Sequence, residues 1–131
     1  MKRTYLASAF VGVTLLSACA SPTPEPPAMT GAAAVSIDRT ADVKAELAEA
    51  AAAAALVTRA TETEPGRIEV ETSIVDPRGD DSSPEAQIAV QVCEMTSKLP
   101  DVNYVNVKEV DGTSFVLFGH PLVPEGECGE V

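Results

Sequence analysis

The chain has 131 residues, of which 20 are Asp or Glu and 9 are Lys or Arg, so its formal net charge is −11 at neutral pH. Nucleic-acid binding needs a basic surface, and this composition argues against it. With no Trp, three Phe and two Tyr, the chain can form only a small hydrophobic core, and its length fits one small domain.

The N-terminus starts with two basic residues, Lys2 and Arg3, and continues with a mostly apolar run over 5–16. A dozen residues form a helix of about 18 Å, whereas a bilayer core needs nearer 20 residues, so the run is too short for a permanent span. The pattern predicts a cleaved signal peptide over 1–18.

The signal peptide is followed by a cysteine in the sequence Leu16-Ser17-Ala18-Cys19. These residues resemble the lipobox of bacterial lipoprotein signal peptides, which reads leucine, small, small, cysteine. The resemblance covers residues 1–19 and implies cleavage before Cys19, a diacylglyceryl thioether on its thiol and often an acyl chain such as palmitate on the new amine. The alternative is an ordinary secretory signal with an incidental cysteine.

A lipid anchor would place the chain on the extracytoplasmic face of a cell membrane. In some lipoproteins an aspartate after the lipidated cysteine is associated with retention in the inner membrane. This chain has Ala20 at that position, so the outer membrane is also a possible location where the source has one. Loss of Lys2 and Arg3 shifts the net charge to about −13, which disfavours adhesion to anionic head groups. The acyl chains would therefore hold the protein, since two chains anchor stably where one does not.

Residues 19–36 are rich in Pro and Ala and predict an extended linker. Residues 37–62 predict an Ala-rich helix, because alanine is the strongest helix former and Asp38 or Thr40 can cap its start. The stretch 61–66, Thr-Glu-Thr-Glu-Pro-Gly, predicts a hinge before the domain.

Residues 66–131 predict a small α+β domain with a C-terminal tail. Strict alternation over 67–75 indicates a half-buried strand, and Ser83-Pro84 begins an amphipathic helix that runs to Leu99. Two further strands, 102–110 and 113–120, flank the hairpin signal Asp111-Gly112. The expected fold is a three-stranded, mostly antiparallel βαββ sheet covered by one helix and preceded by the Ala-rich helix.

Pairing outward from the hairpin sets Val107 opposite Val116 and Val105 opposite Phe118. The other side of these strands also carries apolar groups, and one helix covers only one face of a sheet. The second face therefore needs the Ala-rich helix, a partner chain or a ligand as cover. We take it as a candidate interaction face, formed by Tyr104, Phe115 and Leu117.

Two cysteines, Cys93 and Cys128, remain after Cys19 is assigned to lipid. An even pair in an exported chain predicts a disulfide, here one that ties down the tail. A redox or metal pair is the alternative, but the C-x-x-C spacing and neighbouring His ligands are missing.

Signals for catalysis are weak throughout. His120 is the single histidine, and the sequence contains no G-x-S-x-G, P-loop or H-E-x-x-H motif. Asp76, Asp80 and Asp81 do not match the spacing of a calcium loop. We therefore expect no catalytic residues, no metal, no cofactor and no enzyme activity.

The expected function is that of a membrane-anchored extracytoplasmic lipoprotein whose small domain binds another envelope protein. The alternative is an inhibitory lipoprotein, similar to those by which some phages and prophages block superinfection. The sequence identifies neither the partner nor the ligand.

Overall fold

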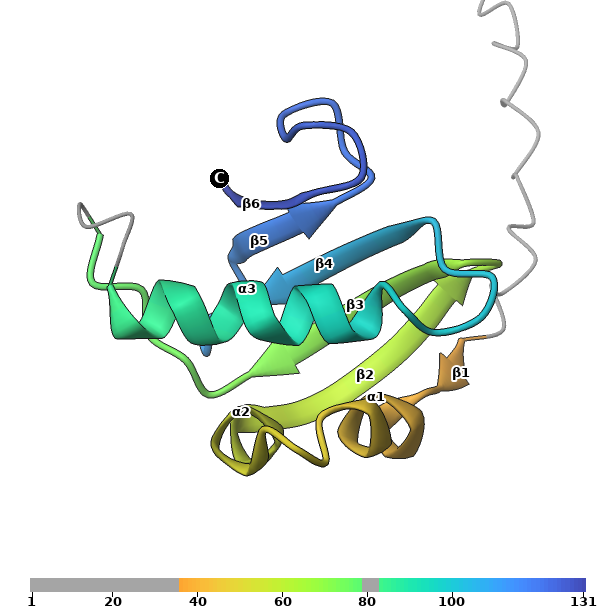
Figure 1. Cartoon of the computed structure of the whole chain (residues 1–131), viewed down its shortest axis with the longest axis horizontal. Coiled ribbons are helices and arrows are strands. Elements are labelled where there is room, and N and C mark those ends of the chain that lie inside the picture. The colour runs from red at the N-terminus through yellow and green to blue at the C-terminus, as the bar shows by residue number, and fades with distance from the viewer. Residues whose placement is uncertain (1–35, 79–82) are drawn as a thin grey trace, which may run out of the picture. The chain divides into compact units, whose positions relative to one another are not determined.

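The computed structural model describes residues 36–78 and 83–131, which lie within one compact unit, Gly31–Val131 (Figure 1). The predicted signal peptide, the predicted lipidation site Cys19 and nearly all of the predicted linker lie outside the described residues. So do Asp80 and Asp81.

The described residues form a mixed six-stranded sheet with three helices, and the strands follow one another across the sheet in chain order, β1-β2-β3-β4-β5-β6. Only β3 and β4 pair in parallel. The prediction of a three-stranded sheet under one helix is therefore wrong. The elements are β1 (Ile37–Asp38), α1 (Thr40–Glu46), α2 (Ala51–Leu56), β2 (Val57–Glu64), β3 (Arg67–Thr72), α3 (Pro84–Thr96), β4 (Tyr104–Lys108), β5 (Ser114–Phe118) and β6 (Cys128–Glu130).

The βαββ part of the prediction is present as β3, α3, β4 and β5. The Ser83 side chain accepts a hydrogen bond from the backbone N–H of Ala86 at 2.9 Å, so serine caps α3 as expected, with Pro84 in its first turn. In the hairpin, Val107 pairs with Val116 and Val105 with Phe118, which confirms the predicted register.

The Ala-rich region forms two short helices and a strand instead of one helix. Its α-helical backbone is interrupted near Ala50, whose φ of −117° and ψ of 59° are not helical. A continuous helix, at about 100° per residue, would place Ala53 about 120° around the axis from Leu47. The interruption lets Val43, Leu47 and Ala53 all enter the core, where each is at most 1% exposed.

Strand β2 was missed because propensity favoured helix up to residue 60 and the Pro65-Gly66 turn was interpreted as a hinge. Gly66 adopts a φ of 77°, as the third position of a type II turn requires, and the turn joins β2 to β3 as a hairpin. Long-range pairing thus overrides local helix preference from Val57 onward.

All three helices pack on the same face of the sheet. Val43 of α1, Ala53 of α2 and Val92 of α3 belong to one hydrophobic core with Ile68 and Val105 of the sheet. In Figure 1, α3 crosses the sheet and α1 and α2 lie toward its β2 side. The Ala-rich region was one of three covers considered for the second face of the sheet. It packs on the first face instead and does not cover the second.

The C-terminal tail ends in β6, which extends the sheet beside β5. A disulfide joins Cys93 of α3 to Cys128 of β6 across a Cα–Cα distance of 6.1 Å, so the predicted bridge is present. It fixes the end of the tail to the helical layer.

Candidate interaction face

The face of the sheet opposite the helices is defined by strand alternation. Ile68 and Val70 of β3 pair in register with Val105 and Val107 of β4, and all four are buried in the core. The alternate residues therefore point to the other side, which we call the open face. Its central members are Arg67, Glu69, Glu71, Tyr104, Asn106 and Lys108.

The structure brings two of the three predicted face residues to the open face. Tyr104 is half-buried there. Leu117 pairs with Asn106 and is 5% exposed, because the tail folds over this strand. A Cβ on Gly129, opposite Leu117, would lie 2.9 Å from the Val123 side chain, which places Val123 above this part of the sheet.

Phe115 belongs instead to the hydrophobic core and is 2% exposed. The pairing of Val107 with Val116 is followed by that of Lys108 with Ser114, which makes Phe115 the extra residue of a β-bulge. A bulge re-aims a side chain and breaks simple alternation. The sequence pattern gave no signal for this irregularity.

An aromatic group occupies the end of the open face where β4 begins. The guanidinium carbon of Arg67 lies 3.9 Å from the centroid of the Tyr104 ring, in cation–π geometry. Tyr104 also meets His120 edge-on, with ring centroids 6.3 Å apart and planes at 63°. His120 Nδ1 accepts the backbone N–H of Leu122 at 3.2 Å, which fixes the orientation of the ring.

The centre of the open face holds an ion pair and an unsatisfied amide. Lys108 Nζ lies 2.7 Å from Glu69 Oε2. Asn106, which pairs with Glu69 across the two strands, is 8% exposed, and its Oδ1 atom has no hydrogen-bond partner among the described residues. Buried polar atoms in native proteins nearly always have a partner, so this orphan acceptor needs an explanation.

Beside the aromatic group lies a hollow of about 570 Å³, which we call the tail hollow. One wall is the segment Val102–Asn103 before β4, and the other is the end of β5 with residues 119–126 of the tail. Two consecutive turns shape this tail: Val123 N–H donates to His120 O at 3.0 Å, and Glu127 N–H donates to Pro124 O at 3.2 Å.

A second hollow, of about 430 Å³, lies at the opposite end of β3 and β4 and is rich in carboxylates. Two of its three carboxylates, those of Glu109 and Asp111, already have local partners. Glu109 accepts from Arg78 Nη2 at 2.7 Å and from the backbone N–H of Asp76 at 3.1 Å. The pKa of Asp111 lies below its ordinary value. The largest cause is the hydrogen bond from the Thr113 backbone N–H, and the second is the hydrogen bond with the Thr113 side chain.

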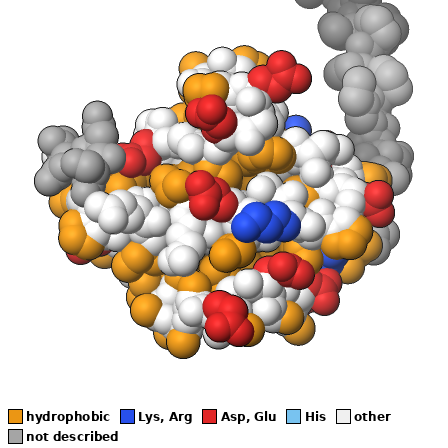
Figure 2. Space-filling model, viewed as in Figure 1, with side chains coloured by type: hydrophobic (Ala, Val, Ile, Leu, Met, Phe, Trp, Pro, Cys, Tyr) orange, Lys and Arg blue, Asp and Glu red, His pale blue; other side chains and the backbone are white. Residues whose placement is uncertain are grey.

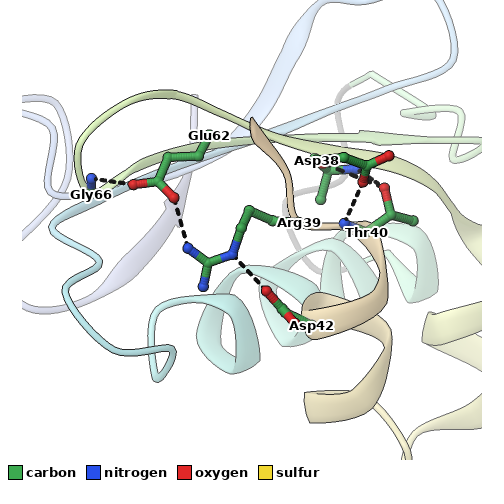
Figure 3. A network of polar contacts seen from close by, with 7 residues as sticks. Asp38, Arg39, Thr40, Asp42, Glu62 and Gly66 are labelled. Atoms are coloured by element: carbon green, nitrogen blue, oxygen red, sulfur yellow. Dashed lines mark hydrogen bonds and ion pairs between the residues drawn. The ribbon is translucent and has the colours of Figure 1, made fainter. Parts of the chain in front are cut away.

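Figure 3 shows a polar network at the outer edge of the sheet, which attaches the segment before α1 to β2 and to the β2–β3 turn. Arg39 bridges Asp42 and Glu62, with both contacts at 2.7 Å, and Glu62 also accepts the Gly66 backbone N–H at 2.9 Å. The Gly66 hydrogen bond, followed by the Arg39 guanidinium, lowers the pKa of Glu62. Each charged side chain of this network has a partner within it, so the contacts serve to hold the segments together.

Two residues of the open face were missed at the sequence level. Arg67 and Asn106 occupy alternate positions of strands whose core-facing positions were assigned correctly, and the candidates chosen for the second face were its large apolar and aromatic residues instead. The one available signal for Asn106 was its position between Val105 and Val107 in a strongly apolar strand.

Among residues 36–78 and 83–131, no three His, Cys, Asp or Glu side chains come together as a metal-binding group. Within the same ranges no helix has the length and hydrophobicity that crossing a bilayer requires. On the helix side of the molecule, Figure 2 shows acidic side chains scattered among apolar and neutral ones, with few Lys and Arg. No protein-family model, curated protein sequence or solved structure matches the chain.

Proposed function

We propose that the protein is a bacterial lipoprotein held at the extracytoplasmic face of a membrane by acyl chains on Cys19, and that its folded domain docks a protein partner through the open face. The anchor rests on the basic start, the short apolar run and the Leu16-Ser17-Ala18-Cys19 box. The disulfide agrees with an oxidising compartment outside the cytoplasm.

The observation that carries the docking proposal is the one-sided packing of the helices. Within 36–78 and 83–131 it leaves the open face without a helical cover, and a buried acceptor, Asn106 Oδ1, lacks a donor there. A partner that shifts the neighbouring side chains and donates a hydrogen bond to this atom would remove the cost of leaving it unsatisfied. Tyr and Arg, which flank Asn106 on this face, are also the residue types enriched at protein interfaces.

Charge indicates what kind of partner fits. Of the seven Lys and Arg among the described residues, Arg59, Arg67 and Lys108 lie on the open face, opposite or beside Glu69 and Glu71. This face is therefore close to charge balance on a strongly acidic protein. Such a surface complements a protein surface that carries charges of both signs, and it fits an anionic membrane or nucleic acid poorly.

The docking proposal is tested by site-specific photo-crosslinking in intact envelopes. A benzoylphenylalanine residue is introduced as Glu71→benzoylphenylalanine on the open face and, as a matched control, as Glu94→benzoylphenylalanine on the exposed side of α3. Both glutamates are exposed, so neither change disturbs the core. A discrete crosslinked protein from position 71 alone supports docking; the same product from both positions, or from position 94 alone, contradicts it.

The anchor has a separate test. Cys19→Ser is expected to release the protein from sedimented envelopes, and intact mass of the native form is expected to show acylation at the new N-terminus. Unchanged sedimentation of Cys19→Ser would contradict the anchor and leave the docking experiment unaffected. The superinfection alternative stays a prediction from the sequence.

A further inference from the structure

Close glycine contacts, two turns and a disulfide define the shape of the tail hollow. Gly119, with a φ of 69°, lies so close to the Asn103 carbonyl that any Cβ would overlap it. Gly129 leaves room for Val123 in the same way. Two turns lie between these glycines, and the disulfide at Cys128 closes the segment. The hollow is therefore preformed, which lowers the entropic cost of binding.

The lining of the hollow combines apolar walls with one negative charge. Apolar surface comes from Val102, Phe118, Pro121, Val123 and Pro124, and polar groups come from Asn103 and His120. Glu125 is the single carboxylate among the described lining residues, and no Lys or Arg lines the hollow. The Glu125 carboxylate has no ion pair with a described residue.

We propose that the tail hollow binds an ammonium or guanidinium group carried on an apolar stem. The apolar walls accommodate the methylene groups of the stem, as they do for Lys and Arg side chains packed along apolar surfaces. The Glu125 carboxylate then makes a charge-assisted hydrogen bond with the cationic end. The hollow has the size of known ligand sites, and the acidic protein attracts cations toward it.

This chemistry has two sources: the side chain of Lys or Arg in a peptide, or a free diamine. The proposal goes beyond the docking function and depends on neither the open face nor the anchor. Its failure would leave crosslinking from position 71 and the sedimentation of Cys19→Ser unchanged.

The test is a titration of the full-length oxidised chain, isotope-labelled and kept in mild detergent, followed by amide chemical shifts. The peptide probe is acetyl-Leu-Lys-Leu-amide, and the matched neutral probe replaces its lysine with norleucine. A third probe is 1,5-diaminopentane. Glu125→Gln removes the charge from the lining, and Glu127→Gln removes the same charge from the tail outside it.

The lysine peptide is expected to shift the amides of Asn103, His120 and Glu125. It should bind about two- to five-fold more tightly than the norleucine peptide, because Glu125 is exposed and water weakens its ion pair. Glu125→Gln should remove that difference, and Glu127→Gln should retain it. Binding of diaminopentane as tight as that of the peptide would assign the free amine as the source, and tighter peptide binding would assign the peptide. Equal binding of the norleucine probe, equal loss in both variants, or no shift with any probe at millimolar concentration overturns the proposal.

Discussion

Arg39 and Glu62 are 23 residues apart in the sequence, and their side chains meet at 2.7 Å at the edge of the sheet (Figure 3). The second oxygen of Glu62 accepts the Gly66 N–H, so one carboxylate joins the N-terminal segment to the β2–β3 turn. Thr40 adds a further link, since its Oγ1 accepts the backbone N–H of Ala60 at 2.9 Å. These contacts attach the start of the domain to its longest strand.

Arg39→Met is expected to lower the free energy of unfolding by about 1–2 kcal/mol, because it removes two charge-assisted hydrogen bonds from a partly buried side chain. Lys44→Met is the matched control: Lys44 lies exposed in α1, the helix that Arg39 precedes, and forms no ion pair with another described residue. Urea unfolding at neutral pH measures the change in unfolding free energy for each of the two variants. An equal effect of the two substitutions would show that the network does not stabilise the fold.

The depressed pKa values of Glu62, Asp38 and Asp111 predict loss of stability in acid. A carboxyl whose pKa is lower in the folded state stabilises the fold above its ordinary value, which for Glu62 is near 4.5, and this stabilisation disappears as the pH falls through the folded value. Unfolding free energies measured from about pH 7 down to about pH 3 should therefore decrease below the ordinary values. Glu62→Gln should flatten part of that decrease, and an unchanged slope would argue against the assigned role.

The disulfide is expected to contribute roughly 3–4 kcal/mol, since it closes a loop with a sequence separation of 35 residues. The double variant Cys93→Ala, Cys128→Ala should lose about this amount and should lose protection from hydrogen exchange in β6. Reduction of the native protein provides the comparison without a substitution. Retained protection of Gly129 after reduction would show that strand pairing alone holds the tail.

Alanine substitutions at Gly119 and Gly112 test whether the close contact between Gly119 and the Asn103 carbonyl stabilises the fold. Both have positive φ, 69° and 86°, but a Cβ at Gly112 would meet nothing within 4 Å, whereas one at Gly119 would overlap the Asn103 carbonyl. Gly112→Ala should cost about 1 kcal/mol from backbone strain alone. Gly119→Ala should cost about 1–3 kcal/mol more, measured by thermal unfolding. Equal costs would mean that the strand and the loop before β4 can separate freely.

Asn106→Leu tests the orphan acceptor on the open face. Replacing the amide by an apolar group of similar volume removes an unsatisfied buried oxygen, so the isolated protein should become more stable by about 1 kcal/mol. The same variant should lose the crosslinked partner captured from position 71. A destabilised variant that still captures the partner would show that Asn106 has a structural role only.

The sequence allowed the βαββ portion to be predicted because its signals were local. Alternation in β3, the Ser83 cap and the outward pairing of Val107 and Val116 each depend on a few neighbouring residues. The even cysteine count predicted the disulfide for a chemical reason that needs no geometry.

The rest of the fold depends on distant partners. Residues 57–64 form a strand because β3 pairs with them, although the preceding alanines favour helix. The β-bulge that places Phe115 in the core depends on the register between β4 and β5, and the local sequence does not indicate it. The contact of Arg67 with Tyr104 and the hollow beside His120 likewise arise only when segments from three parts of the chain assemble.

The sheet ends on its shortest strands, since β1 has two residues and β6 has three. An outer strand with many vacant N–H and C=O groups can recruit a neighbouring molecule and start fibril-like growth, and very short borders limit that risk. Molecules confined to a two-dimensional film would collide far more often than free ones. On a membrane, the short edge strands β1 and β6 would therefore limit strand pairing between neighbouring copies of the protein.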